Sequence, residues 1–311
     1  MTRHTRLGLF IRPDDALDDY IAWHRQGAPS PAAFRRSFRR RLFREINESG
    51  LSRVLFSDEA LYSSSDEELR RLRRFIGRFA GSLRLVVYLR RQDDHLMSRY
   101  QQVVKVGETR RLTEWAHDPE HSDTYDYYVR LCAWERLLKP DEFVVRRFEP
   151  DSFMDGSLLQ DFFDAAGIDA RVDDLAPAPT RNPSLDAESV EFLRVFNLYR
   201  VENEAARVGL IYNRELVKRL AEHSTGQTLT MPTAFLDKFV AQWEEGNQAV
   251  ARRYLRDATG ELFRRPRTTD NTTTEQHLDP DRLDHFLTLL ELPEQVHAPL
   301  RRVVEREAMG H

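Results

Sequence analysis

The stretch Leu83–Gln102, LRLVVYLRRQDDHLMSRYQQ, decides the fold because its pattern changes from strand to helix within a few residues. Its apolar and β-branched first half predicts a buried strand, and the Asp-Asp pair that follows is typical of a helix N-terminus. Arg90 stands at the expected strand end, and Ser98 follows eight residues later. Open α/β sheets bind ligands at the carboxyl ends of their strands, where an arginine beside a helix N-terminus can hold a phosphate group.

Similar strand patterns recur along the first half of the chain, at Leu7–Ile11 (LGLFI), Arg53–Phe56 (RVLF) and Phe143–Phe148 (FVVRRF). Between them lie amphipathic stretches that predict helices over 31–48, 66–79, 93–106 and 123–138. This alternation indicates an α/β fold, a parallel sheet flanked by helices.

From about Ser184 the pattern is helical only, which predicts a helical C-terminal half. We expect its helices at 185–208, 215–223, 232–255, 280–290 and 293–307. The polar, Thr-rich stretch 264–279 reads as a linker. The expected organisation is therefore one α/β domain over 1–263, a linker over 264–279 and a small helical appendage over 280–311.

Composition argues against a nucleic-acid partner. The net charge is −4, and hydrophobic residues make up 41% of the chain, enough for a packed core. Basic residues number 47, but the lysines among them are only Lys105, Lys139, Lys218 and Lys238. Such an arginine bias indicates a GC-rich genome more than a polyanion partner. The runs Arg35–Arg41 and Arg70–Arg74 alternate with apolar residues, as solvated helix faces do.

The single cysteine, Cys132, excludes an intrachain disulfide and a multi-cysteine metal site, and its apolar surroundings predict a core residue. No stretch resembles a signal peptide, and no apolar run reaches the ~20 residues that span a bilayer. We therefore expect a reduced, cytoplasmic protein without a membrane span or a metal.

The stretch around Arg90 and Ser98 resembles the 3′-phosphate-binding segment of sulfotransferases that use 3′-phosphoadenosine 5′-phosphosulfate (PAPS). In that family an arginine ends the strand and a serine follows after the same interval. Upstream, Val54–Tyr62 (VLFSDEALY) is similar to the strand and Ser-x-Glu pattern of bacterial sulfotransferase-like proteins. Three later segments resemble further parts of that bacterial branch, so that the similarity covers roughly Val54 to Phe263: Phe143–Ile168, Asn182–Asn197 and Gly246–Phe263.

The resemblance implies a P-loop-like, three-layer fold and transfer of a sulfuryl group from PAPS to a hydroxyl or amine acceptor, such as a carbohydrate. It makes Arg90 and Ser98 the candidate nucleotide-binding residues. The alternative to nucleotide binding is an ion pair with a neighbouring acid for Arg90 and a solvated helix position for Ser98. Glu59 is the candidate general base. In the polysaccharide branch of the family the acidic residue follows the strand more directly, which would place it at the position of Ser57 here. Asp58 is a third possibility. Either Ser57 or Asp58 could instead cap a helix.

Family members begin with a strand and a Lys-Thr/Ser-Gly-Thr-Thr loop that holds the 5′-phosphosulfate, and no such loop follows LGLFI here. The segment that does, Arg12–Leu17 (RPDDAL), has no glycine, and its two adjacent carboxylates would repel a phosphosulfate. Ser224–Thr228 (STGQT) has suitable residue types, but its helical surroundings predict an ordinary turn. We therefore expect that the chain either starts downstream of the true start or has lost the loop and the activity.

Two functions remain open at this point, and whether the protein is an enzyme is left undecided by the sequence. The first is sulfuryl transfer by a sulfotransferase-like protein that is incomplete or degenerate. The second is a non-catalytic descendant of the fold that binds a nucleotide or another protein.

Overall fold

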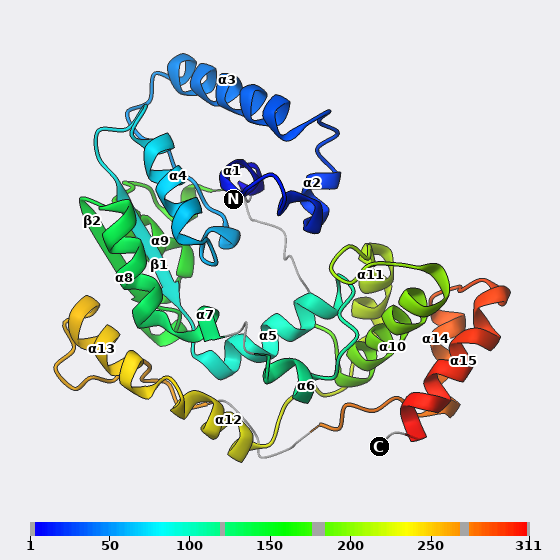
Figure 1. The fold of residues 1–311 in the computed structure, drawn as a ribbon. Coiled ribbons are helices and arrows are strands. Elements are labelled where there is room, and N and C mark those ends of the chain that lie inside the picture. Colours follow the sequence, from blue (N-terminus) through cyan, green and yellow to red (C-terminus); the bar gives the residue numbers. More distant parts are fainter. Residues whose placement is uncertain (1–3, 119–121, 176–183, 268–273, 310–311) are drawn as a thin grey trace. The chain divides into compact units, whose positions relative to one another are not determined.

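The computed structural model describes residues 4–118, 122–175, 184–267 and 274–309, which are mostly helical with one small parallel sheet (Figure 1). The chain divides into two compact units, and it passes between them more than once. The first unit comprises Met1–Arg90, Ser122–Ala178 and Trp243–Arg265. The second comprises Arg91–His121, Pro179–Gln242 and Pro266–His311. These boundaries differ from the expected division at 263 and 280.

The sheet of the first unit consists of β1 (Arg84–Leu89) and β2 (Glu142–Arg147). The two strands run parallel, with Arg84 opposite Glu142 and Leu89 opposite Arg147. The strands expected from 83–89 and 143–148 are thus confirmed. The segment between β1 and β2 includes helices, as a parallel connection requires.

The strand expected at Leu7–Ile11 is wrong, because this segment lies in helix α1 (Thr5–Ile11). All five of its residues are buried. A fully apolar run has no alternation of polar and apolar residues, so its sequence cannot distinguish a buried helix from a buried strand. The strand expected at Arg53–Phe56 is also wrong: the segment is not part of any ladder among the described residues. Val54 and Leu55 are exposed there, at 43% and 38%, so this run is not a core strand.

Local signals in the sequence account for both ends of α3 (Pro31–Ser49) and for the start of α4 (Asp66–Ile76). Ser30 begins α3 by accepting a hydrogen bond from the backbone of Ala33, and Gly50 ends it with a φ of 62°. Ser65 and Glu68 form a reciprocal capping box at the start of α4. The helices of this unit are α1, α2 (Ile21–His24), α3 (Pro31–Ser49), α4 (Asp66–Ile76), α7 (Ser122–Tyr125), α8 (Tyr127–Leu138), α9 (Leu158–Ala166) and α13 (Glu244–Tyr254). Its 3₁₀ turns are Leu17–Asp19, Glu59–Leu61, Pro150–Ser152, Met154–Gly156 and Val172–Asp174.

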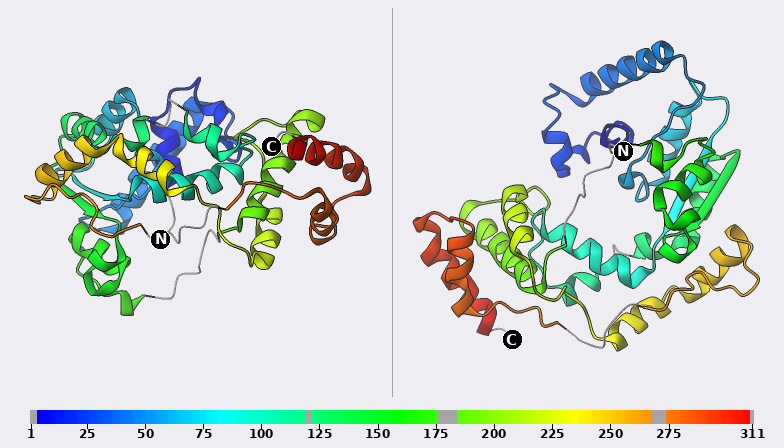
Figure 2. Two further views of the ribbon diagram at one scale, coloured as in Figure 1. Left: turned by 90° about the horizontal axis from the view of Figure 1, so that it is seen from below. Right: turned by 180° about the vertical axis from the view of Figure 1, so that it is seen from behind.

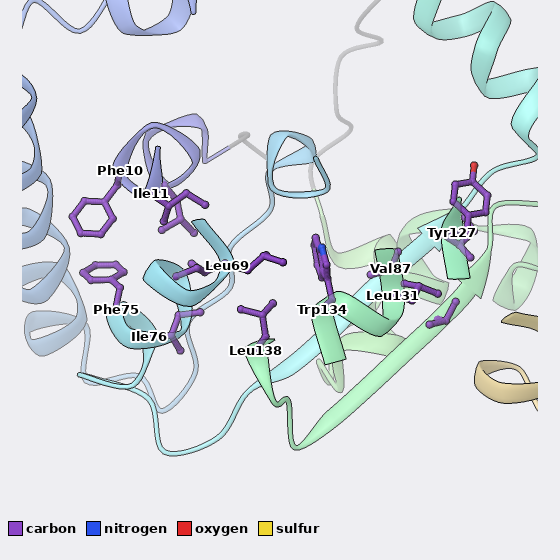
Figure 3. Packing of buried hydrophobic residues seen from close by; sticks show 14 of the residues in the cluster. Phe10, Ile11, Leu69, Phe75, Ile76, Val87, Tyr127, Leu131, Trp134 and Leu138 are labelled. Atoms are coloured by element: carbon purple, nitrogen blue, oxygen red, sulfur yellow. The ribbon is translucent and has the colours of Figure 1, made fainter. Parts of the chain in front are cut away.

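The core of the first unit lies between α1, α4, α8 and the sheet (Figure 3). Phe10 of α1 faces Phe75 of α4, with ring centroids 4.3 Å apart. Trp134 and Leu138 of α8 lie beside Leu69 of α4 in the same cluster. The long helix α3 packs on this layer through aromatic side chains, which fixes it against α1 and α4.

The second unit is helical among its described residues. Its helix α10 (Ala187–Glu204) packs against α5 (Gln92–Val104) and α15 (Glu294–Met309), and Figure 2 shows α10 and α15 side by side. The remaining helices are α6 (Leu112–Ala116), α11 (Arg214–His223), α12 (Thr233–Ala241) and α14 (Leu283–Leu289), with a 3₁₀ turn at Pro280–Arg282. The expected C-terminal appendage thus packs on α10 through α15.

Two expected helices are each divided into two. The helix expected at 123–138 is interrupted at Asp126, whose side chain accepts from the backbone of Val129 and so caps α8. The helix expected at 232–255 becomes α12 and α13, which belong to different units. Throughout the described ranges, no helix is both long enough and apolar enough to cross a bilayer.

Candidate functional site

Arg90 lies where the carboxyl ends of the two strands meet. The backbone amide of Phe148 donates a 2.7 Å hydrogen bond to the carbonyl of Leu89, which extends the pairing beyond β2. The Arg90 guanidinium lies 6.0 Å from the centroid of the Phe148 ring. The hydroxyl of Tyr127, at the start of α8, donates to the carbonyl of Arg90 at 2.5 Å. Strand end, ring and hydroxyl together fix the position of Arg90.

The guanidinium of Arg90 forms no ion pair with a carboxylate in the described parts of the chain. The alternative expectation for this residue, a salt bridge to a neighbouring acid, is therefore not seen there. Arg90 is half-buried, which makes a charge-assisted bond to an oxyanion stronger than it would be in bulk water. The residue keeps its donors available for a ligand.

The other arginines at this end of the sheet are already paired. Arg147 and Arg264 both bind the carboxylate of Asp257, each at 2.6 Å. Hydrogen bonds from Thr259, Arg264 and Arg147 hold the pKa of Asp257 well below its usual range. Glu149, directly after Phe148, is buried and accepts from the backbone amides at 264 and 265. This arrangement ties the segment after α13 to the end of β2.

Ser98 lies in α5 and belongs to the second unit, whereas Arg90 is the last residue of the first, so each is described within its own unit. The apolar side of α5 buries Leu96, Tyr100 and Val104, as its spacing predicts. Ser98 is half-buried and lies off this stripe. Its assignment to a nucleotide site stays a prediction from the sequence.

A carboxylate of the protein, that of Asp93, is bound at the N-terminus of α5. The buried carboxylate of Asp93 accepts from the backbone amide of Asp94 at 2.9 Å. Arg91 binds the same carboxylate at 3.0 Å and Arg267 binds it at 2.6 Å. Within the second unit, the start of α5 therefore already binds the Asp93 carboxylate through one backbone amide and two arginines.

Glu59 begins a 3₁₀ turn over Glu59–Leu61 in the first unit, and its side chain is exposed. Asp58 caps this turn by accepting from the backbone of Ala60 at 3.2 Å, so the helix-cap alternative applies to Asp58. Glu59 makes no ion pair with Arg90 or with any other described cation. The Glu59 side chain is open to solvent, and the structure does not bring it into contact with Arg90.

Ser57 and Asp58 both lie against the first helix and the residue that precedes it. The backbone amide of Ser57 donates to His4 Nδ1 at 2.9 Å, and its carbonyl accepts from the His4 amide at 2.8 Å. A Cβ on Gly8 would lie only 2.7 Å from Asp58 Oδ2. Gly8 is therefore required for the close approach between α1 and this segment.

The STGQT segment is irregular rather than the ordinary turn expected: Gly226 lies at a bend, and Thr228 forms an isolated β-bridge with Asp186. The amide of Gly226 donates to Asp186 Oδ2 at 3.1 Å, and the Ser224 hydroxyl accepts from the backbone amide of Asp186. Asp186 also caps α10 through the amide of Ser189, at 2.8 Å. Burial raises the pKa of Asp186, but hydrogen bonds from Ser189, Gly226 and Ser224 outweigh it and lower the pKa. A phosphosulfate would have to displace this carboxylate.

The sequence analysis did not identify two residues that contact Arg90, namely Tyr127 and Phe148. The parallel pairing of the two predicted strands was the available signal for Phe148, because it brings both strand ends to one edge. No comparable signal exists for Tyr127, whose hydroxyl reaches Arg90 only through the packing of α8. The described residues contain no cluster of His, Cys, Asp and Glu arranged to hold a metal ion.

Comparison with known proteins assigns no function. No protein-family model matches the chain, and no solved structure matches it. A protein of Archaeoglobus fulgidus, described only as an uncharacterized protein, is 28% identical over 207 residues. The alignment covers 65% of this chain and 54% of the relative, so the chain spans about half the length of the curated relative that it matches.

Proposed function

We propose that this chain is a sulfotransferase-like protein that binds the 3′-phosphate of 3′-phosphoadenosine 5′-phosphosulfate through Arg90. The observation that carries the proposal is an arginine without a carboxylate partner among the described residues, held at the carboxyl end of a parallel strand pair. Ligand sites of α/β sheets lie at that edge. The finer form of the fold, a P-loop-like arrangement of three layers, is part of the same proposal.

The proposed reaction is an in-line displacement at sulfur. A hydroxyl or amine of the acceptor, such as a carbohydrate, attacks the sulfur atom, and the bond from sulfur to the 5′-phosphate oxygen breaks. The products are the sulfated acceptor and 3′,5′-bisphosphoadenosine, and the acceptor proton passes to the Glu59 carboxylate. Such transfer depends on positioning and on neutralising charge. Each charge-assisted hydrogen bond from Arg90 contributes about 1.5–3 kcal/mol.

Calorimetry with two nucleotides tests the phosphate assignment. The wild-type chain should bind 3′,5′-bisphosphoadenosine more tightly than 5′-AMP, because only the former carries the phosphate that Arg90 recognises. Arg90→Ala should abolish this preference. Arg84→Ala is the matched control, since Arg84 stands at the opposite end of β1 and pairs with Glu142. Equal affinity of the wild-type chain for both nucleotides would overturn the assignment.

A second candidate function is a non-catalytic descendant of the fold that senses a nucleotide or binds a protein. The carboxylate of Asp186 favours it, because it already binds the Gly226 amide of the STGQT segment, whose residue types would otherwise suit a phosphosulfate. Transfer of radiolabelled sulfate from PAPS to a panel of carbohydrate and amine acceptors separates the two functions. Nucleotide binding without transfer supports the non-catalytic descendant.

A further inference from the structure

Two arginine-rich stretches that lie far apart in the sequence line one cleft in the first unit. The cleft has a volume of about 200 Å³, and the aromatic side chains of Phe10 and Phe75 contribute to its lining. Figure 3 shows the Phe10 and Phe75 rings facing each other. Six arginines complete the lining: Arg35, Arg36 and Arg39 from α3, and Arg71, Arg74 and Arg78 from α4 and the turn after it.

Two of the six arginines hold the cleft together. Arg35 donates to the carbonyl of Arg12 at 2.6 Å, and Arg71 donates to the same carbonyl at 2.7 Å. Arg35 also forms an ion pair with Asp14, and Arg71 forms one with Glu67. The end of α1 therefore joins α3 to α4, and this fixes the distance between the two helices.

The other four arginines are Arg36, Arg39, Arg74 and Arg78. None of them forms an ion pair or a hydrogen bond with a side chain in the described ranges. Arg36 and Arg39 are spaced i,i+3, and Arg74 and Arg78 are spaced i,i+4, so each pair lies on one side of its segment. Four positive charges without carboxylates repel one another across the cleft, and an anion between them would relieve this repulsion.

We propose that this cleft is a second anion site, for a small ligand that carries two or more phosphate or sulfate groups. Guanidinium groups bind such oxyanions with two parallel hydrogen bonds, which suits arginine better than lysine. Charges on both walls favour clustered oxyanions, since a single one neutralises only part of the site. The small, concave cleft and the net charge of −4 favour a compact ligand over a nucleic acid. The site is independent of the proposed function at Arg90.

Binding of three probes tests the site, measured by calorimetry in the full chain carrying Arg90→Ala so that the strand-end arginine contributes nothing. Inorganic triphosphate should bind at least 10-fold more tightly than inorganic phosphate. A sulfated heparin disaccharide, compared with triphosphate, shows whether sulfate or phosphate groups are preferred. Binding of neither triphosphate nor the disaccharide overturns the proposal, as does equal affinity for phosphate and triphosphate.

Paired arginine variants separate the cleft from general charge. Arg39→Ala/Arg74→Ala should weaken triphosphate binding at least 10-fold, and Arg39→Lys/Arg74→Lys should weaken it less because the charges remain. The control Arg40→Ala/Arg70→Ala removes one arginine from each of the same helices outside the cleft, and it should change the affinity less than 2-fold. All four positions are exposed, so circular dichroism should show unchanged folding. An equal loss in the control variant overturns the proposal.

Discussion

The hydroxyl of Tyr127 donates a 2.5 Å hydrogen bond to the carbonyl oxygen of Arg90, and this bond joins the start of α8 to the end of β1. The bond acts on the backbone, so it leaves the guanidinium of Arg90 available. Phe148 supports the guanidinium from the end of the neighbouring strand. The proposed phosphate site is therefore positioned by two residues that do not themselves bind the phosphate.

Tyr127→Phe should weaken binding of 3′,5′-bisphosphoadenosine without removing its preference over 5′-AMP. The variant keeps the buried ring but loses a hydrogen bond worth about 0.5–1.5 kcal/mol, which corresponds to roughly a 2- to 10-fold loss of affinity. Calorimetry measures both nucleotides. Tyr128→Phe is the control, because Tyr128 is the next residue on α8 and its hydroxyl contacts Arg253 instead. Loss of the preference itself would mean that Tyr127 contributes directly to the phosphate site.

Glu59→Gln should lower kcat for sulfuryl transfer by about 10²-fold or more, if the protein turns over, because a general base is typically worth that much. The affinity for 3′,5′-bisphosphoadenosine should stay within 2-fold, since the proposed role of Glu59 is toward the acceptor. Steady-state kinetics and calorimetry give the two quantities. Glu67→Gln is a control on an exposed carboxylate of the same unit. A fully active Glu59→Gln protein would direct attention to Asp58.

The strand pattern predicted β1 and β2 correctly because both combine β-branched residues with partial burial. The prediction of a strand at LGLFI failed for a physical reason: all five residues of this run are buried, so the run lacks the polar positions that reveal a helical period. Polar capping residues also marked the starts of α3 and α4, at Ser30 and Ser65. The break between α12 and α13 contains no glycine or proline, so the local sequence does not predict that a helix ends there.

The candidate site was predictable only in part. Arg90 could be placed because a strand end is a local property of the sequence. Its lack of a carboxylate partner among the described residues could not be predicted, since partners such as that of Arg147 come from residues more than 100 positions away. The arginine-lined cleft shows the same limit. Arg39 and Arg74 each lie on a solvated helix face, as expected, and only the packing of α3 onto α4 brings those faces together.

Arg194→Met should destabilise the second unit by about 3–5 kcal/mol. The Arg194 side chain is buried at 2% exposure and binds Glu191 at 2.6 Å and Glu307 at 2.7 Å. Removing the arginine leaves the buried Glu191 carboxylate without its counter-charge, which is the costly step. Urea denaturation followed by circular dichroism measures the loss.

The double variant Arg194→Met/Glu191→Met is the informative comparison for this ion pair. It removes both buried charges together, so it should recover most of the stability that the single variant loses. Equal instability of the single and double variants would mean that packing around α10, rather than the unpaired carboxylate, determines the loss.

Asp186→Asn should remove a pH-dependent contribution to stability. The pKa of Asp186 in the folded chain is lowered, because hydrogen bonds from Ser189, Gly226 and Ser224 outweigh the effect of burial. The charged carboxylate therefore stabilises the fold at pH values above the unfolded pKa of about 3.9. This stabilisation is lost as the pH falls through the lower pKa of the folded chain. Asparagine caps a helix about as well as aspartate, but it offers one side-chain acceptor where Asp186 uses two, so the variant removes the charge together with the hydrogen bond from Gly226.

We expect the wild-type chain to exceed Asp186→Asn in unfolding free energy by about 1 kcal/mol at pH 7, the scale of one such hydrogen bond. The difference should shrink as the pH falls through the lowered pKa of Asp186 in the folded chain, because a protonated aspartate and an asparagine are both neutral. Urea titrations across this range provide the comparison. Glu222→Gln serves as the control, because Glu222 is an exposed carboxylate of the same unit that makes no ion pair among the described residues. A difference between wild type and Asp186→Asn that stays constant from pH 7 to pH 2.5 would exclude the carboxylate charge as its cause.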